Sequence, residues 1–259
     1  MNFSKIYALG LRHLYLVMNS FPRVLDLIYW PTVQIFLWGF ISKFFTLNSE
    51  YYNNTVGVIL TAAILYDFLF RASISFIMMF LEEIWSRNFT NLFIAPIKIR
   101  EIIAALTLTA IIRTLIGLVP AVIIAIPLFG VSVLHLGLPL IFLLIWLYLF
   151  GITLGLLLTS GLLRYGPSFE YIAGASLFFL APLGCIYYPI DILPDFLQII
   201  AKGLPLVHIF EEMRNILINN SVNYFNIFKS ISISVVYFIF GVIVFYFSYF
   251  GAKKRGTLI

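Results

Sequence analysis

The sequence predicts an all-α integral membrane protein with about six transmembrane helices, on the strength of its composition and one long uncharged segment. Hydrophobic residues make up 62% of the 259 residues, charged residues make up 10%, and the mean hydropathy is +1.05. A soluble domain carries about 25% charged residues. Between Arg113 and Arg164 no Asp, Glu, Lys or Arg occurs. Because one helical crossing takes about 20 residues, this segment has room for two crossings and a turn.

Six apolar stretches are candidates for membrane crossings. They are residues 24–44, 56–81, 102–126, 138–162, 171–188 and 230–250. Turn-forming residues separate the third stretch from the fourth, namely Pro127, Gly130, His135, Gly137 and Pro139. No soluble domain or internal repeat is recognisable, so we expect a single transmembrane domain over residues 1–259.

Residues 1–23 predict a helix that lies along the membrane surface. At the helical period one face carries Phe3, Ile6, Tyr7, Leu14 and Met18, and the opposite face carries Lys5, Arg12 and Asn19. Such a helix buries its apolar side in lipid. The basic residues interrupt every apolar core before it reaches the length of a signal peptide, so we expect no cleavage here.

Basic residues predict the orientation. With both termini in the cytoplasm, most of them fall on the cytoplasmic side, and only Lys43, Lys202, Arg214 and Lys229 fall outside. This asymmetry satisfies the positive-inside rule. We therefore expect a multi-pass protein of the plasma membrane, the inner membrane of a bacterium, with both termini cytoplasmic.

Three ionisable residues lie deep within the predicted spans, away from the span ends: Asp67, Arg71 and Arg113. A charge at the centre of a span costs about 2.5–3.5 kcal/mol on insertion scales, so each needs a partner. Asp67 and Arg71 are four residues apart and can pair on one helical face. Arg113, on the next span, could share Asp67. The cluster is either an electrostatic clamp between helices or a proton or ion relay.

The loop after the second span predicts a short amphipathic helix from Glu83 to Phe93. Glu82 and Glu83 give it an acidic start, as a helix N-terminus prefers, and Pro96 stops it. Trp85, Phe89 and Phe93 follow at a spacing of four, which places them near one face. The helix either binds a partner protein or lies on lipid headgroups.

Residues 189–229 are too polar for a full span and too apolar for an ordinary loop. Pro194 and Pro205 break this segment into two short helical pieces. Broken helices that dip into a membrane are tolerated where they pack on protein or line a cavity. His208 and Glu212 have a spacing that can hold a metal, but no further His or Cys lies nearby, so we predict no metal site.

Enzyme signatures are missing from the sequence. It has no Gly-Lys dipeptide and hence no P-loop, no Gly-x-Ser-x-Gly elbow and no His-Glu-x-x-His run. We therefore predict no catalytic residues. The single Cys185 excludes an intrachain disulfide and a multi-cysteine metal site. The bases are scattered among membrane-flanking loops, which argues against nucleic-acid binding.

The order of these features resembles the membrane subunit of type-2 ATP-binding-cassette (ABC) exporters. The resemblance is carried by Glu82, Glu83, Trp85 and Arg87, by Leu92, Phe93, Ala95 and Pro96, and by Tyr188, Pro189, Leu193, Pro194, Leu204, Pro205, Glu212 and Arg214. It covers nearly the whole chain.

The resemblance implies several partners and roles. The loop from Glu82 to Pro96, with Phe89 at its centre, would dock on a separate ATPase subunit. Pro189, Pro194, Pro205, Glu212 and Arg214 would belong to outer re-entrant helices that close the exit. The chain would work as a homodimer with two ATPase subunits, which would hold ATP and Mg²⁺, and would itself carry no cofactor.

Two classes of function stay open at this stage. The first is an exporter permease that moves an amphipathic or hydrophobic substrate such as a drug, a lipid or a lipid-linked glycan. The second is an intramembrane enzyme that acts on a lipid, for which Asp67, Arg71 and Arg113 would form the reactive cluster. The sequence does not choose among the substrates.

Overall fold

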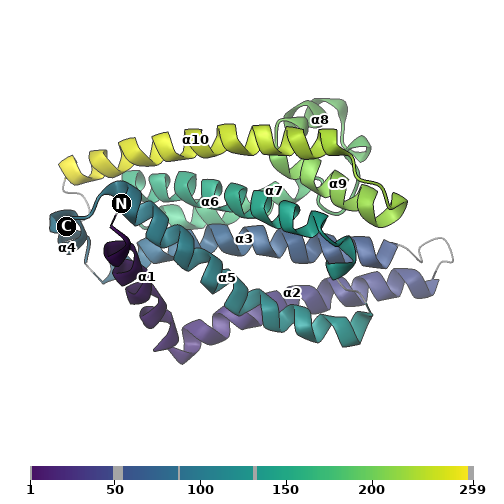
Figure 1. Ribbon diagram of the computed structural model, residues 1–259, viewed down its shortest axis with the longest axis horizontal. Coiled ribbons are helices and arrows are strands. Elements are labelled where there is room, and N and C mark those ends of the chain that lie inside the picture. Colours follow the sequence, from purple (N-terminus) through teal and green to yellow (C-terminus); the bar gives the residue numbers. More distant parts are fainter. Residues whose placement is uncertain (1, 49–54, 87, 131–132, 256–259) are drawn as a thin grey trace.

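The computed structural model describes residues 2–48, 55–86, 88–130 and 133–255, and every regular element in these ranges is helical. The chain forms one elongated bundle (Figure 1). Its helices are α1 (Phe3–Met18), α2 (Phe21–Asn48), α3 (Thr55–Trp85), α4 (Phe89–Ile94), α5 (Ile99–Phe129), α6 (Pro139–Tyr165), α7 (Phe169–Leu183), α8 (Asp195–Lys202), α9 (Pro205–Asn219) and α10 (Tyr224–Arg255), with 3₁₀ turns η2 (Val133–Leu136) and η3 (Ile190–Ile192). The structure confirms the all-helical prediction.

Five helices in the described residues are long and apolar enough to cross a membrane: α2, α3, α5, α6 and α10. Each contains or closely matches a predicted span. The fifth predicted span, residues 171–188, is different, because α7 ends at Leu183 after 15 residues. At 1.5 Å per residue α7 is about 22 Å long, which is shorter than the hydrocarbon core.

The early end of α7 has a local cause. Pro182 lies in its last turn, and Cys185 adopts a left-handed backbone conformation with φ 50°. A helix cannot continue through such a residue. Arg214 of α9 donates from Nη1 to the carbonyl oxygen of Cys185 at 2.8 Å. This hydrogen bond fixes the turn to α9.

Helix α3 lies at the centre of the bundle and contacts α2, α5, α6, α7 and α9. Small residues allow α6 to approach it closely. A Cβ added at Gly151 would lie 2.9 Å from the Leu69 carbonyl oxygen, and one at Gly155 would meet the Phe76 side chain. Ser73 Oγ also donates to the Gly151 carbonyl oxygen at 2.9 Å. Close backbone approach at small residues is typical of helix pairs in membranes.

The turn between α5 and α6 lies where the sequence predicted it. Gly130 ends α5 with φ 64°, Gly137 has φ 61°, and Pro139 is the first residue of α6. Glycine adopts a positive φ without a steric cost. His135 lies in η2, and its side chain is outside the described part of the structure.

The N-terminal helix α1 presents a different face from the one predicted. Ile6, Leu9, His13 and Val17 are buried, because this side packs on α5 and α2. Gly10 permits the contact, since a Cβ there would lie 3.2 Å from Thr109 Oγ1 of α5. The prediction that Ile6 faces lipid is therefore wrong. Other members of the predicted apolar face, Phe3, Tyr7 and Met18, are exposed.

The segment after α7, which the sequence predicts to be re-entrant, consists of η3, α8 and α9. Pro194 immediately precedes α8 and Pro205 opens α9, so both prolines break the chain where the sequence predicted. Helix α9 is deeply buried against α3, α6 and α10. This segment lies at the opposite end of the bundle from α1 and α4 (Figure 1).

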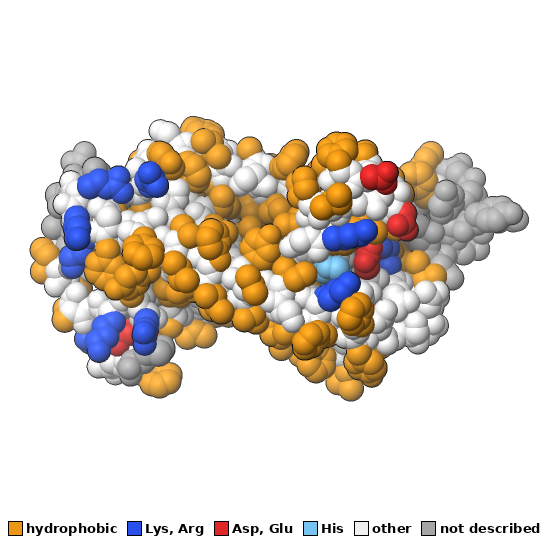
Figure 2. Space-filling view, turned by 90° about the horizontal axis from the view of Figure 1, so that it is seen from above, with side chains coloured by type: hydrophobic (Ala, Val, Ile, Leu, Met, Phe, Trp, Pro, Cys, Tyr) orange, Lys and Arg blue, Asp and Glu red, His pale blue; other side chains and the backbone are white. Residues whose placement is uncertain are grey.

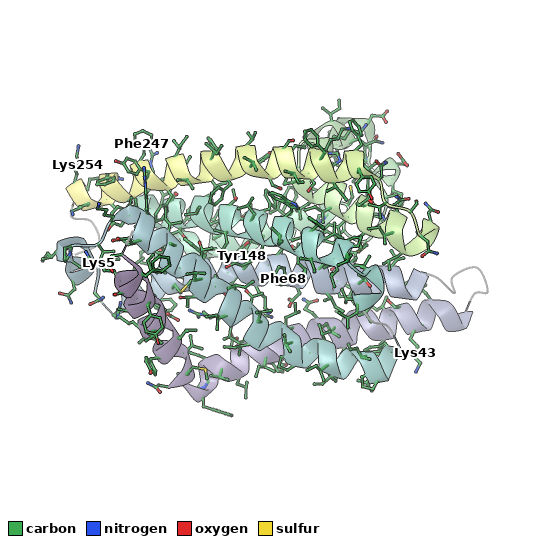
Figure 3. The ribbon with its side chains drawn as sticks, in the orientation of Figure 1. Lys5, Lys43, Phe68, Tyr148, Phe247 and Lys254 are labelled. Atoms are coloured by element: carbon green, nitrogen blue, oxygen red, sulfur yellow. The ribbon has the colours of Figure 1, made fainter. Side chains whose placement is uncertain are left out.

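The surface agrees with a membrane environment. In Figure 2 hydrophobic side chains cover the middle of the visible face, and the charged side chains gather toward its two ends. Lys5 and Lys254 lie at the end that holds α1 and α4, whereas Lys43 lies at the other end (Figure 3). Between them Phe68 and Tyr148 pack in the interior with ring centroids 6.0 Å apart.

Candidate functional site

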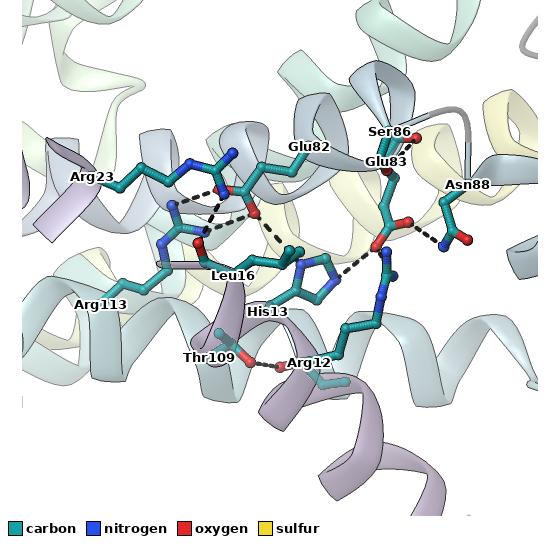
Figure 4. A network of polar contacts seen from close by, with 11 residues as sticks. Arg12, His13, Leu16, Arg23, Glu82, Glu83, Ser86, Asn88, Thr109 and Arg113 are labelled. Carbon is teal, nitrogen blue, oxygen red and sulfur yellow. Dashed lines mark hydrogen bonds and ion pairs between the residues drawn. The ribbon is translucent and has the colours of Figure 1, made fainter. Parts of the chain in front are cut away.

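The most extensive polar network of the described residues lies where α3 ends, beside α1 and α5. Its carboxylates are Glu82 and Glu83, which are 7% and 2% exposed. Both belong to the last turn of α3, so the prediction that they start a separate coupling helix is wrong. Carboxylates are disfavoured at a helix C-terminus because of the helix dipole. Cationic side chains from three other helices compensate here (Figure 4).

Glu82 contacts one residue from each of α5, α2 and α1. Arg113 donates from Nη2 to Oε1 at 3.2 Å and from Nη1 to Oε2 at 3.4 Å. Arg23 Nη1 lies 3.9 Å from Oε1, and His13 Nδ1 lies 3.7 Å from Oε2. The bidentate pair of Arg113 with Glu82 joins α5 to α3.

Glu83 connects α1 to the segment that leads into α4. Arg12 Nη1 donates to its Oε1, and His13 Nε2 lies 3.4 Å from the same oxygen. Asn88, the residue before α4, donates from Nδ2 to Oε2 at 2.7 Å. The two glutamates and their partners, Arg12, His13, Arg23 and Arg113, are called the α3-end cluster below.

The charges predicted inside the spans separate into two sites. Arg71 Nε donates to Asp67 Oδ2 at 3.0 Å, and both residues are buried, which confirms that they pair on α3. Arg113 does not share Asp67, because its guanidinium is bound to Glu82, which lies nearer the end of the same helix α3. The three residues therefore form no single reactive cluster of the kind that the enzyme hypothesis required.

A groove between α2 and α3 runs past both sites. Its first part is a hollow of about 270 Å³ whose lining includes Arg23, Glu82 and Arg113. Its second part is a hollow of about 410 Å³ lined mainly by α2, α3 and Phe178 of α7, and it includes Asp67. Four residues line both parts: Asp26, Arg71, Ile74 and Met78. We call this continuous feature the α2–α3 groove.

The α2 wall of the groove adds polar groups that the sequence analysis did not select. Trp30 Nε1 donates to Asp26 Oδ1 at 2.9 Å, and Gln34 lies one turn farther along the same side of α2. The groove is thus lined by charges of both signs alternating with Ile74, Met78, Phe70 and Phe178. Such a surface can contact both the polar and the apolar parts of an amphipathic molecule.

The remaining residues of the predicted coupling loop are spread over two elements. Trp85 ends α3 and is 58% exposed, whereas Leu92 of α4 is buried in the bundle. Pro96 accepts a hydrogen bond from Lys5 Nζ of α1 through its carbonyl oxygen. Arg87 and the side chains of Phe89 and Phe93 lie outside the described residues. The predicted continuous helix from Glu83 to Phe93 is wrong, and α4 covers only residues 89–94.

At the opposite end of the bundle, Glu212 and Arg214 fasten α9 to its neighbours. Glu212, which is fully buried, accepts from Asn223 N at 2.7 Å and from Asn226 Nδ2 at 3.4 Å. Burial raises the pKa of the Glu212 carboxyl, although these two donors act in the opposite direction. His208 Nε2 contacts the Lys202 carbonyl oxygen at 3.1 Å, so the two side chains of the predicted i, i+4 spacing have different partners.

Pro189 precedes η3, and the turn at Cys185 is held by the Arg214 guanidinium. Desolvation lowers the pKa of Arg214. These residues were predicted from their position in a broken segment, and in the structure Glu212 and Arg214 hold that segment together.

Comparison with protein families gives one match. Residues 17–218 match the family model described as the ABC-2 type transporter. The match begins near the end of α1 and ends in α9, so it includes the α2–α3 groove and both glutamates of the α3-end cluster. No curated protein matches this sequence.

Proposed function

Since the chain belongs to the ABC-2 type transporter family, we propose that it is the permease subunit of an ATP-driven exporter and that the α2–α3 groove is its half of the substrate pathway. One observation carries the proposal. Asp67 and Arg71 are charged residues inside a membrane span, and both line a hollow of about 410 Å³. Charges within spans that face a cavity mark substrate or ion paths.

The proposed substrate is amphipathic: a drug, a lipid or a lipid-linked glycan. The groove alternates ion pairs with exposed edges of Ile74, Met78 and Phe178. We propose that a second copy of the chain closes the open side of the groove. Exposed aromatic and aliphatic residues of α2 and α7 would form the contact surface between the two copies, among them Leu37, Phe40 and Phe179.

A separate ATPase subunit is the proposed source of energy. Helix α4 and the exposed Trp85 lie at one end of the bundle, and Ile94 of α4 is 77% exposed. We propose that α4 docks on the ATPase. Movement of α4 would displace Glu83 through the hydrogen bond from Asn88. The adjacent Glu82 would then move Arg113, which lines the groove.

The orientation belongs to the same proposal: the end with α1 and α4 faces the cytoplasm of a bacterial cell and the end with α8 faces outward. Cysteines introduced at Asn2 and Asn220 test it in intact cells with a membrane-impermeant thiol reagent. We expect labelling at position 220 and none at position 2. The reverse pattern would refute the orientation.

Cysteine accessibility also tests the groove itself. Ile74→Cys and Met78→Cys lie on the groove wall, whereas Ile239→Cys and Ile243→Cys occupy the same i, i+4 spacing on the exposed side of α10. Burial raises the pKa of native Cys185 to about 11, so it reacts little at neutral pH. A charged methanethiosulfonate should modify the α3 cysteines in membranes and leave the α10 cysteines unmodified. Equal reactivity at both pairs would remove the groove from the pathway.

A further inference from the structure

A second hollow, separate from the α2–α3 groove in most of its lining, lies at the corner between α1 and α2. It has a volume of about 450 Å³. We call it the elbow pocket, and it is lined by Arg12, Tyr15, Leu16, Asn19, Ser20 and Arg23. The lining contains two arginines and no acidic residue, so its own charge favours an anion.

The corner that forms this pocket is held by local hydrogen bonds. Asn19 N donates to the Tyr15 carbonyl oxygen and Ser20 N donates to the Val17 carbonyl oxygen, both at 3.0 Å. Arg23 Nη1 donates across the corner to the Leu16 carbonyl oxygen at 2.9 Å. The chain then enters α2 at Phe21. The start of α2 has a partial positive charge and the end of α1 at the same corner has a partial negative one, so the two arginines carry the attraction for an anion.

Both arginines keep donors available for a ligand. Among the described residues, the contacts of Arg12 with Glu83 and those of Arg23 with Leu16 and Glu82 all use Nη1. The Nε and Nη2 groups of each guanidinium remain. The side chains are 36% and 44% exposed, so they are fixed on one side by the α3-end cluster and open on the other. Two pre-oriented guanidiniums match the oxygens of a phosphate diester.

The surroundings of the pocket match the depth of lipid headgroups. Exposed apolar residues flank it: Tyr15 at 60%, Met18 at 59% and Phe21 at 77%. Aromatic residues of this kind gather at membrane interfaces. The apolar surface of α2 continues from the pocket with Leu25 and Tyr29, which are 48% and 53% exposed. Acyl chains of a lipid bound in the pocket would lie along this side of α2.

We propose that the elbow pocket binds the headgroup of an anionic phospholipid, with Arg12 and Arg23 on the phosphate and with Asn19 and Ser20 as further donors. The apolar strip on α2 distinguishes a lipid from free phosphate as the source of the anion. The bound headgroup would lie beside the α3-end cluster and fix the angle between α1 and α2. The pocket shares Arg23 with the α2–α3 groove, and its other lining residues lie outside that groove.

Native mass spectrometry of the purified full-length chain tests the proposal. The protein is presented with equal amounts of phosphatidylglycerol and phosphatidylcholine in detergent. We expect preferential retention of phosphatidylglycerol and a loss of about fivefold in that preference for each arginine replaced in Arg12→Gln and Arg23→Gln. Arg164→Gln is the matched control, since Arg164 lies on α6 above the Tyr165 ring and outside the pocket.

Loss of the arginine–glutamate pairs could unfold the corner, so a second variant leaves them intact. Asn19→Asp is isosteric and adds a negative charge to the pocket, whereas Asn19→Ala removes the amide without adding charge. Asn19→Asp should lower phosphatidylglycerol retention more than Asn19→Ala does. Equal retention of both lipids by the unmodified protein, or displacement of phosphatidylglycerol by inorganic phosphate, would overturn the proposal.

Discussion

Helix α3 carries acidic residues at two levels, and their surroundings differ. Asp67 pairs with Arg71 on its own helix and lines the α2–α3 groove. Glu82 and Glu83 are approached by cationic side chains from α1, α2 and α5. Both sites are buried, but the first connects residues within one helix and the second connects four helices. A substitution at the first site should change the groove, and one at the second should change the assembly of the bundle.

The largest expected effect of a single substitution is at Glu82. In Glu82→Gln the Arg113 guanidinium, which is 5% exposed, loses its counter-charge. Removing one partner of a buried pair costs about 3–5 kcal/mol. We expect a lower yield of inserted protein and a clearly lower unfolding temperature in detergent. Asp195→Asn on exposed α8 is the control and should unfold like the unmodified chain. A normal unfolding temperature for Glu82→Gln would show that the α3-end cluster does not hold the helices together.

A smaller effect is expected at Asp67. Asp67→Asn removes the charge but keeps an oxygen for Arg71 Nε, and both residues reach the groove. A hydrogen bond to a charged group contributes about 1.5–3 kcal/mol, and the neutral amide oxygen retains part of it. The double variant Asp67→Asn, Arg71→Gln should recover part of this loss, because it leaves no unpaired charge. Thermal unfolding of the two variants measures the recovery. A double variant less stable than Asp67→Asn would contradict the pairing.

Glu212 is a third buried carboxylate with different partners. It accepts hydrogen bonds from Asn223 and Asn226. Within the described ranges it accepts none from a cationic side chain. Its pKa is raised above the ordinary glutamate value of 4.5. The folded protein therefore binds this proton more tightly than the unfolded chain does, and stability falls as the pH rises from 4.5 through the raised pKa.

Glu212→Gln should remove that pH dependence at a cost of about 0.5–1.5 kcal/mol or less, since Gln can still accept from Asn223 N. Unfolding temperatures measured from pH 4.5 to pH 7.5 give the comparison, with the less buried Glu211→Gln as the control. If Glu212→Gln retains the slope of the unmodified chain, another group is responsible for it.

The parts of the fold that follow from neighbouring residues were predictable. Long apolar stretches predicted five of the spans, and Gly130 and Gly137 predicted the α5–α6 turn. The spacing of four residues predicted the Asp67–Arg71 pair. The α3-end cluster was not predictable in this way. Arg12 and Glu83 are separated by 71 positions and Arg113 and Glu82 by 31, and only the packing of α1 and α5 on α3 brings them together.

The same packing explains why the predicted coupling helix does not begin at Glu83. Two consecutive glutamates resemble a helix N-terminus when the local sequence is considered alone. Here three arginines and His13, all from other helices, stabilise them at a helix C-terminus. The tertiary contacts outweigh the local preference, and α3 therefore continues to Trp85.

The central claim is that ATP used by a partner changes the α2–α3 groove through α4. The most direct test is the rate at which Met78→Cys reacts with a charged methanethiosulfonate when the chain is assembled with the proposed ATPase subunit. Adding ATP and vanadate should change this rate severalfold, and Ile94→Asp on exposed α4 should abolish the change by preventing docking. Ile243→Cys on α10 should be insensitive to nucleotide. A rate at Met78→Cys that is the same with and without nucleotide would contradict the account.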